Sequence, residues 1–387
     1  MIRSVRLVRF GLFAMLVGVA VAFGVPEPQG CGGEAVVEEA VGQTEGQAVT
    51  ARCSGQRRDL SSDASHCGTC NHSCLGGTCK SGQCQPFLLT NANTSVLRLA
   101  VEGNDLYFVE SYAATGRWGA TREQSRLKRI SRSGGAVTTL VSDPVWPAPP
   151  LAVDASYVYF QAGDQLNRVP RAGGAVSPLA SVGRVMDLFL TSTGIYVADD
   201  QGSITLVSKS GGNPTTIVNR HAYRGYAYHG TALFAKDSYN HQILSIPLTG
   251  GAESLLTGVN ADGRSSLIWA NSNQLFWTTN DGIYWMPTTG GQAPVQVYGY
   301  QETDSRSIYP LALDANYLYW IEGSFSTNKL MRKSLSGGAK TVLASFDRGI
   351  WQDMQVDSTA IYLAQGEEHH GDFGLDIRPG AIWKLAK

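Results

Sequence analysis

The sequence has little charge and no excess of either sign. Asp, Glu, Lys and Arg make up 16% of the 387 residues, and the formal net charge at pH 7 is −1. A protein that binds nucleic acid through its phosphates needs clustered Lys and Arg, and no basic stretch of that kind occurs here. The sequence therefore predicts no nucleic-acid partner.

The motifs of several common enzyme classes are missing as well. There is no G-x-S-x-G nucleophile elbow, and no lone cysteine with a partner histidine. The paired glycines stand between predicted strands and are not followed by helices, so they do not form a phosphate-binding loop. We predict no catalytic residue, no cofactor and no bound metal. A binding role is favoured, and enzymatic activity stays open.

Glycine, by contrast, is abundant and recurs in pairs. Gly-Gly pairs begin at 134, 173, 211, 250, 290 and 337, which are 39, 38, 39, 40 and 47 positions apart. Ahead of each pair stands an aromatic strand, such as "DLYFV" from Asp105 or "YLYWI" from Tyr317, and a seventh, "AIYLA", starts at Ala360. Residues 311–344 predict four strands, at 311–313, 317–321, 330–334 and 340–344. A period near 40 with four strands per unit is typical of a β-propeller.

The last unit lacks a fourth strand. Its third strand is predicted at 381–385, and no Gly-Gly turn follows it. Residues 86–90 precede the first full unit and are similar to the fourth-strand segment at 177–181. We predict that they pair with 381–385 and close the ring, which removes an exposed sheet edge. The fold class is therefore all-β, a seven-bladed β-propeller over residues 86–387, with a six-bladed ring as the alternative.

Two units carry a resemblance to a known repeat. "LFWTTNDGIYWMPTTGG" from Leu275 and "LYWIEGSFSTNKLMRKSLSGG" from Leu318 resemble the YWTD repeats of extracellular receptor propellers. The resemblance implies a propeller in an extracellular compartment. The chain differs from that family in its predicted number of blades, because the propellers of the family have six.

The N-terminus has the features of a signal peptide, predicted at residues 1–24. Arg3, Arg6 and Arg9 precede an apolar run at 10–25, and "AVA" at 20–22 offers a cleavage site. The run is short for a membrane span, although an uncleaved anchor helix is the alternative. We predict an exported protein, secreted or located at the outer cell surface or in the periplasm.

Cys31 stands apart from the six other cysteines. Its context "PQGCGGEA" resembles bacterial lipoproteins, in which such a cysteine carries the lipid, and lipidation here would leave an even number of cysteines. The prediction is a membrane tether through Cys31, with an unmodified thiol as the alternative. Residues 25–52 are small and acidic and predict a flexible linker.

A cysteine-rich module is predicted at residues 53–85. It has few apolar residues, so cross-links must stabilise it, and we predict three disulfides among Cys53, Cys67, Cys70, Cys74, Cys79 and Cys84. Fifteen pairings are open. The alternative is a zinc site at Cys67-x2-Cys70 with His66, His72 and Cys74. The pattern "DLSSDASHCGTCNHSC" resembles the stigma-specific cysteine-rich family, which has bacterial counterparts on exported proteins, and implies an extracellular spacer or adhesion module.

Long insertions are predicted on one face of the propeller, where strand two meets strand three and where each blade leads to the next. We call this the long-loop face. The insertions are rich in Trp, Tyr, Arg and His, the residue types that anchor ligands. We predict a surface that binds a protein, peptide or glycan, made by Tyr112, Arg117, Trp118, Trp146, Tyr223, Arg224, Tyr300, Arg306, Arg348, Trp351, His369 and His370.

Two alternatives concern metal and catalysis. The run Glu367-Glu368-His369-His370-x-Asp372 could hold a divalent cation, although a solvated polar loop is favoured. A propeller enzyme, either a metal-dependent lactonase of the gluconolactonase type or a lyase like streptogramin lyase, would place polar groups on the inner strands. Those strands offer only Asp187, Asp353 and Gln355.

Overall fold

A computed structural model of the chain describes residues 49–92, 94–115, 121–145, 150–219, 223–237, 240–258, 267–279, 281–299, 308–323, 327–347, 349–370 and 376–387. At 112–115, 121–123, 143–145, 223–224, 308–310, 368–370 and 376–378 it describes the backbone alone. The predicted signal peptide, Cys31 and the linker up to residue 48 lie outside the described residues. Every regular element within them is a β-strand, and no helix there is long and apolar enough to cross a membrane.

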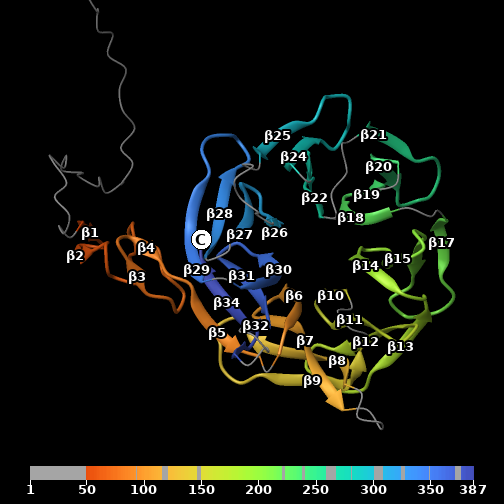
Figure 1. Ribbon diagram of the computed structural model, residues 1–387, viewed down its shortest axis with the longest axis horizontal. Coiled ribbons are helices and arrows are strands. Elements are labelled where there is room, and N and C mark those ends of the chain that lie inside the picture. The colour runs from red at the N-terminus through yellow and green to blue at the C-terminus, as the bar shows by residue number, and fades with distance from the viewer. Residues whose placement is uncertain are drawn as a thin grey trace, which may run out of the picture. The chain divides into compact units, whose positions relative to one another are not determined.

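Seven four-stranded antiparallel sheets follow one another around a ring (Figure 1). The innermost strand of each sheet contacts the innermost strand of the next, and this circle is complete. The prediction of seven blades is confirmed, and the six-bladed alternative is wrong. Blade 1 contains β6 (Val96–Glu102), β7 (Asp105–Thr115), β8 (Thr121–Ser131) and β9 (Thr138–Val145); blade 2, β10 (Leu151–Val153), β11 (Tyr157–Ala162), β12 (Gln165–Pro170) and β13 (Ser177–Ser181); blade 3, β14 (Val185–Leu190), β15 (Ile195–Asp199), β16 (Ile204–Val207) and β17 (Thr215–Val218); blade 4, β18 (Tyr223–His229), β19 (Ala232–Asp237), β20 (Gln242–Pro247) and β21 (Ser254–Gly258); blade 5, β22 (Ile268–Ala270), β23 (Gln274–Thr278), β24 (Gly282–Pro287) and β25 (Val295–Gly299); blade 6, β26 (Ile308–Leu313), β27 (Tyr317–Gly323), β28 (Thr327–Ser334) and β29 (Thr341–Asp347); blade 7, β30 (Ile350–Val356), β31 (Ala360–Gly366), β34 (Ala381–Ala386) and β5 (Phe87–Asn91).

Blade 7 is made from two distant parts of the chain. β5 pairs with β34, with Asn91 opposite Ala381 and Phe87 opposite Lys384, as the sequence predicted. Gly380 supports this seam, because its amide donates to the Thr94 carbonyl and its carbonyl accepts from Ala92. A Cβ at Gly380 would lie 2.1 Å from the Thr94 oxygen, so the close approach requires glycine.

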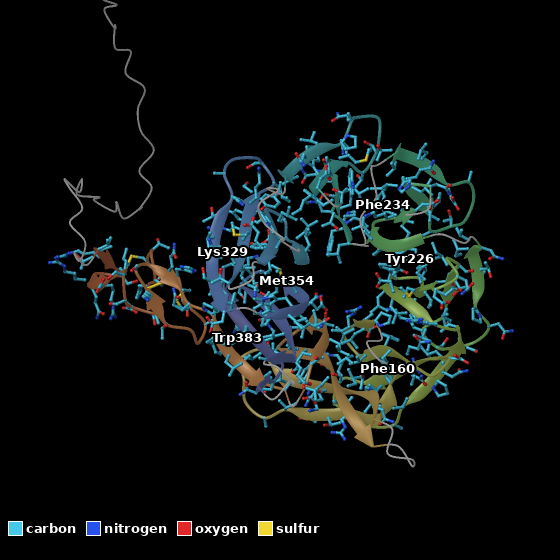
Figure 2. The ribbon with its side chains drawn as sticks, in the orientation of Figure 1. Phe160, Tyr226, Phe234, Lys329, Met354 and Trp383 are labelled. Carbon is cyan, nitrogen blue, oxygen red and sulfur yellow. A yellow bond between two sulfur atoms is a disulfide. The ribbon has the colours of Figure 1, made fainter. Side chains whose placement is uncertain are left out.

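The blades bury their apolar faces against one another. Phe160 of blade 2, labelled in Figure 2, packs in one cluster with Val109 of blade 1. Trp320 of blade 6 is fully buried in a cluster with Phe276 of blade 5. Burial of one such side chain contributes roughly 1.5–3 kcal/mol to the stability of the fold. A single blade on its own would expose the apolar side chains of both its faces and lose this contribution.

The turns opposite the long-loop face are stabilised by their own side chains. The Asp314 carboxylate accepts from the amides of Asn316 and Tyr317, each at 2.8 Å, and Asp154 and Asp357 repeat this geometry. Such Asx turns favour a short connection between strands one and two. The Gly-Gly pairs between strands three and four have positive φ, for example 91° at Gly173, which favours glycine.

A cation just after the third strand links several blades to the preceding blade. Arg171 Nε donates to the Tyr107 hydroxyl at 2.7 Å, and Arg132 Nε does the same to Tyr362 across the seam at 2.7 Å. Lys209 and Lys387 reach the carboxylates of Asp154 and Asp314 instead, which also accept from Tyr159 and Tyr319. We call each of these pairs of residues a latch. These pairs were not predicted from the sequence.

One predicted long loop is largely strand. β7 and β8 pair from Asp105 opposite Ser131 out to Thr115 opposite Thr121, so most of the insertion predicted between strands two and three of blade 1 is a β-ribbon. β7 contains neither glycine nor proline, and antiparallel pairing continues where nothing ends it. β32 (Glu368–His370) and β33 (Asp376–Arg378) form a similar small hairpin.

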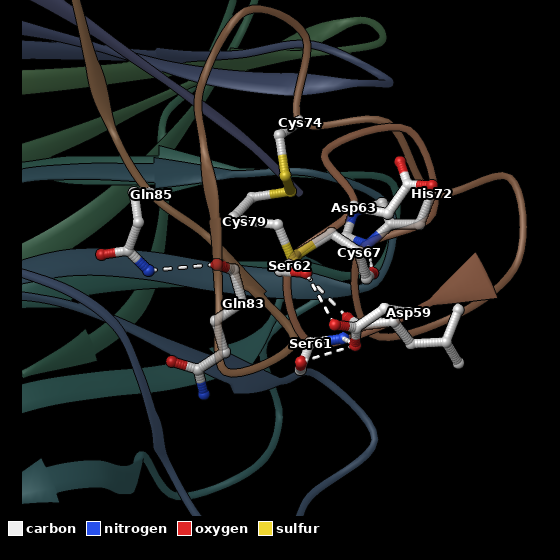
Figure 3. Close-up of a disulfide and its surroundings, with 12 residues drawn as sticks. Asp59, Ser61, Ser62, Asp63, Cys67, His72, Cys74, Cys79, Gln83 and Gln85 are labelled. Carbon is white, nitrogen blue, oxygen red and sulfur yellow. Dashed lines mark hydrogen bonds between the residues drawn. A yellow bond between two sulfur atoms is a disulfide. The ribbon is translucent and has the colours of Figure 1, made fainter. Parts of the chain in front are cut away.

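The cysteine-rich segment contains two short hairpins, β1 (Thr50–Cys53) with β2 (Gln56–Asp59) and β3 (Cys79–Lys80) with β4 (Gln83–Cys84). Three disulfides are present, Cys53–Cys70, Cys67–Cys79 and Cys74–Cys84. Figure 3 shows the disulfide between Cys67 and Cys79 with its surroundings. The alternative of a zinc site is wrong, because each cysteine that it needs is in a disulfide.

His72 joins this segment to the propeller. One ring nitrogen lies 2.7 Å from the Cys67 carbonyl oxygen, and the other lies 2.6 Å from the backbone oxygen of Lys387. Cys67, Cys74 and Cys84 belong to the same buried cluster as residues of blades 6 and 7. The disulfides and the last described residue of the ring are therefore held together.

Candidate functional site

A hollow of about 430 Å³ opens between blades 6 and 7 at the long-loop face. We call it the inter-blade pocket. The fourth strand of blade 6, β29, supplies one wall, and β34 and β5 of blade 7 supply the other. It is lined by Pro86, Asn91, Ser345, Phe346, Asp347, Trp351, Gln365, Pro379, Ala381 and Trp383.

Three aromatic rings dominate the pocket. The Phe346 ring lies 4.8 Å from Trp351 and 5.9 Å from Trp383, measured between centroids, and meets both edge to face. Trp383 projects from β34, where Figure 2 labels it. Edge-to-face pairs hold one another in place, so the rings form a rigid apolar surface.

The two indole N–H groups differ. Trp383 Nε1 donates to Gln365 Oε1 at 2.8 Å. Trp351 is only 6% exposed, yet its Nε1 has no acceptor among the described residues. A buried donor without a partner is unfavourable by about 1–3 kcal/mol, and this nitrogen is enclosed by the protein, so the donor lies behind the wall of the pocket.

Polar groups surround the rings. Asp347, Ser345 and Asn91 are exposed, and Gln365 is partly buried. The backbone that carries Asp347 is fixed, since Asn328 Nδ2 donates to the carbonyls of Asp347 and Gly349 at 3.2 and 3.4 Å. The pocket thus combines an apolar surface with a carboxylate and amides at its edge.

The structure places few of the predicted binding residues. Trp351 is the one whose side chain it describes, and it lies in the inter-blade pocket. Tyr112 on β7, Tyr223 and Arg224 on β18, and His369 and His370 on β32 are described by their backbone alone. The others, Arg117, Trp118, Trp146, Tyr300, Arg306 and Arg348, lie outside the described residues, so the proposed surface stays a prediction.

Sequence reasoning missed Phe346 and Trp383 as site residues. Phe346 was expected to lie in the long connection that leads from blade 6 to blade 7, and Trp383 was expected to be an ordinary strand residue. Their meeting with Trp351 depends on how blade 6 faces blade 7. A signal was available in the density of aromatic residues on either side of the predicted seam.

The central channel holds the few charged residues of the inner strands. Arg98, Asp187 and Asp353 each follow a β-bulge in the first strand of their blade. Asp353 accepts from the amides of Leu99 at 2.7 Å and Met354 at 2.8 Å, so it joins blade 7 to blade 1.

Asp187 is less well satisfied than Asp353. It accepts from the Leu188 amide at 2.9 Å, and burial raises its pKa to about 7 against the opposing effects of that amide and of Arg98. Burial also raises the pKa of Asp353. Among the described residues, sets of three ligand-type side chains close enough to share a metal ion occur only in the disulfide-bonded segment.

No protein-family model matches the chain, and no curated protein matches it either. Solved structures are similar in fold. YCF48 bound to D1 peptide has a TM-score of 0.56 at 11% identity, over 78% of this chain and 95% of that chain. A catalytically inactive virginiamycin B lyase from Staphylococcus aureus with quinupristin has a TM-score of 0.56 at 14% identity, over 78% and 98%. A streptogramin B lyase has a TM-score of 0.54 at 12% identity, over 78% and 97%.

These likenesses show the fold alone. The chain is a seven-bladed β-propeller protein with three disulfides ahead of the ring. The similar structures include a protein bound to a peptide and two lyases, and at 11–14% identity they share the fold with this chain.

Proposed function

We propose that this protein is exported, is tethered to the cell surface through Cys31, and binds a protein, peptide or glycan on the long-loop face of its propeller. The observation that carries the proposal is the pocket on that face, in which the rings of Phe346, Trp351 and Trp383 pack together beside exposed polar groups. A rigid, partly apolar hollow with a few polar groups is the usual form of a ligand site. The peptide bound by YCF48, a neighbour in fold, is consistent with this role.

The export and tether rest on the sequence. The basic N-terminus with its apolar run, the cysteine context "PQGCGGEA" and the three disulfides all favour an oxidising compartment outside the cytoplasm. The disulfide-bonded segment would then act as a spacer between the linker and the ring. Replacement of Cys31 with Ser should move the protein from the membrane fraction to the soluble fraction, and unchanged fractionation would contradict the tether.

Binding can be tested with the full chain. The purified protein is immobilised and probed with a peptide library and a glycan array, and the measurement is repeated with Trp118→Ala plus Trp351→Ala. We expect a specific signal that the double variant loses. Trp285→Ala serves as the control, because Trp285 is a partly buried tryptophan on β24 of blade 5, away from the pocket.

Thermal unfolding of each variant separates lost binding from lost folding. A double variant that melts like the Trp285→Ala control and still binds as well as the parent would refute the assignment of the long-loop face. The absence of any specific signal from peptides, proteins and glycans alike would refute the binding role.

A second candidate is an enzyme that uses the central channel. With a pKa of about 7, the Asp187 carboxyl exchanges between its protonated and ionised forms near neutral pH, which suits a general acid or base. Arg98 offers a positive charge in the channel. The lyases with similar folds favour this candidate. Turnover of streptogramin or lactone substrates that Asp187→Asn abolishes would support it, and equal rates with and without the protein would exclude these reactions.

A further inference from the structure

We infer that His72 is a proton-dependent clamp between the disulfide-bonded segment and the propeller. When its ring carries two protons, it ties Cys67 of that segment to Lys387, which follows β34 of blade 7. When the ring loses one proton, one of these two ties breaks. The inference concerns the joint between the two parts of the chain and does not depend on what the propeller binds.

Both nitrogens of the His72 ring face oxygen atoms that can only accept. Nδ1 lies 2.7 Å from the Cys67 carbonyl oxygen, and Nε2 lies 2.6 Å from the backbone oxygen of Lys387. A neutral imidazole has one N–H and one bare nitrogen, so either tautomer would set a lone pair against an oxygen at hydrogen-bond distance. A ring turned over would present C–H groups to both oxygens and make neither bond. The imidazolium ion, which donates from both nitrogens, fits this geometry.

Both oxygens are held in place by other contacts. Cys67 is fully buried, and its amide donates to the His72 carbonyl at 2.9 Å. On the other side, the Lys387 amide donates to the Thr359 carbonyl at 3.0 Å, and its Nζ donates to Asp314 at 2.5 Å. Because neither acceptor is free to move aside, a ring that loses a proton must give up one of them.

The charged groups on the ring side of the clamp have partners of their own. The Lys387 ammonium would oppose a second cation nearby, but it is paired with the Asp314 carboxylate. Burial acts to raise the pKa of Asp314, yet hydrogen bonds, led by that of Lys387, hold this pKa below its ordinary value. Burial is outweighed in the same way at Asp357, whose pKa is lowered by hydrogen bonds within its turn. Both carboxylates therefore stay ionised between about pH 5 and 8, the range in which histidines lose a proton.

On the side of the disulfide-bonded segment, the titratable groups close in sequence are Asp63 and His66. Asp63 accepts from the Ser65 amide at 2.9 Å. His66 already uses a bare ring nitrogen, because its Nδ1 accepts from the Asn71 amide at 3.0 Å. A neutral ring thus suits the surroundings of His66 but not those of His72. His66 is therefore the matched control for a substitution at His72.

The direction of the pH effect follows from the proton that the closed joint holds. The open joint releases this proton more readily, so the joint is favoured at low pH and weakens as pH rises through about 5 to 8. Cys74 and Cys84 keep their buried contacts with blades 6 and 7 when the clamp opens. The segment therefore loosens from the ring without separating from it.

The test measures hydrogen exchange of the full chain at pH 5.5 and 8.5, corrected for the pH dependence of chemical exchange. Peptides that cover residues 60–84 report on the joint. Peptides from blade 5 report any change in the whole ring, which is needed because Asp187 also titrates near neutral pH. We expect exchange in residues 60–84 to be about tenfold faster at pH 8.5, as for the loss of one hydrogen bond from a charged donor. Blade 5 should change much less.

Two variants and one spectroscopic measurement decide the assignment. His72→Gln should exchange fast at both pH values, and His66→Gln should keep the pH response of the parent. Nitrogen NMR of the parent, labelled at histidine, should show protons on both ring nitrogens of His72 at pH 7. A bare nitrogen on that ring at pH 7 would overturn the inference without any variant. Equal exchange at the two pH values in the parent, or a pH response that His72→Gln retains, would overturn it too.

Discussion

The latch between blades 1 and 2 can be tested by a double-mutant cycle on Tyr107 and Arg171. Arg171 Nε donates to the Tyr107 hydroxyl at 2.7 Å, and Arg171 Nη2 donates to the Glu102 carbonyl at 2.8 Å. Tyr107 is fully buried, whereas the Arg171 side chain is 21% exposed. Removal of the Arg171 guanidinium therefore leaves a buried hydroxyl, whereas removal of the Tyr107 hydroxyl leaves a guanidinium that water can reach.

The expected magnitudes follow from that difference. Tyr107→Phe removes one hydrogen bond to a charged group, and Arg171 can still reach water, so we expect a loss of about 1–2 kcal/mol in the free energy of unfolding. Arg171→Leu removes both bonds to blade 1 and leaves the Tyr107 hydroxyl with Asp105 at 3.4 Å, a weak replacement. We expect a loss of about 3 kcal/mol.

The double variant Tyr107→Phe plus Arg171→Leu should lose no more than Arg171→Leu alone. No hydroxyl is then left unsatisfied, so the two effects should fall short of additivity by about 1–2 kcal/mol. Blade 5 and blade 6 already use this solution, because Phe276 and Leu335 pack together at the same positions. This junction has no latch of the kind described above, so the ring can close there with apolar residues.

The measurement is urea unfolding of the full chain with its disulfides intact, followed by tryptophan fluorescence and by circular dichroism. Agreement of the two probes is required before free energies are compared. Strict additivity of the two substitutions would refute the reasoning, since it would mean that the hydroxyl and the guanidinium stabilise the blades independently.

Three other predictions concern the pocket, the channel and the seam. Trp383→Phe should lower the unfolding free energy by about 1 kcal/mol more than Trp351→Phe in urea titrations, because only the first loses a made hydrogen bond; equal losses would contradict the unpaired state of Trp351. The pKa of Asp187, about 7, lies above its ordinary value of 3.8, so the unfolded chain releases this proton first and stability should fall as pH rises from about 4 to 7. Asp187→Asn should reduce that fall by about 2 kcal/mol, allowing for water in the channel, and an unchanged difference between unfolding at pH 4.5 and 7.5 would contradict it. Gly380→Ala should lower the melting temperature by several degrees through its contact with the Thr94 carbonyl, whereas Gly258→Ala, with open space around its Cβ, should leave it unchanged; equal melting temperatures would show that the seam tolerates a side chain.

Much of the architecture could be predicted because local turn residues and the periodic repeat in the sequence specify it. The Gly-Gly pairs mark turns that need positive φ, and the aromatic second strands mark the buried centre of each sheet. The seam could be predicted because an unpaired strand at each end of a repeat array has one obvious partner. These features depend on residues close in sequence or on the repeat itself.

The site depends on contacts that no period encodes. Phe346 on β29 and Trp383 on β34 are far apart in the sequence, and they meet only because blade 6 packs against blade 7. The latches were missed for a different reason. Arg132, Arg171 and Lys209 stand two residues before successive Gly-Gly pairs, so the signal was present in the repeat. It becomes meaningful only when the tyrosine and aspartate of the preceding blade are placed opposite.

The composite nature of blade 7 has a consequence for how the chain acquires its structure. β5 is made early and must wait for β34, about 290 residues later, before its backbone groups find their partners. Until then the nascent ring has two open edges, and closure must bring distant segments together against the entropy of the intervening chain. The adjacent disulfides and the contact of His72 with Lys387 lie where this slow final step takes place. If the cysteines are oxidised before the ring closes, the segment that precedes β5 is already ordered. Pairing of β5 with β34 should then be faster, and so should folding.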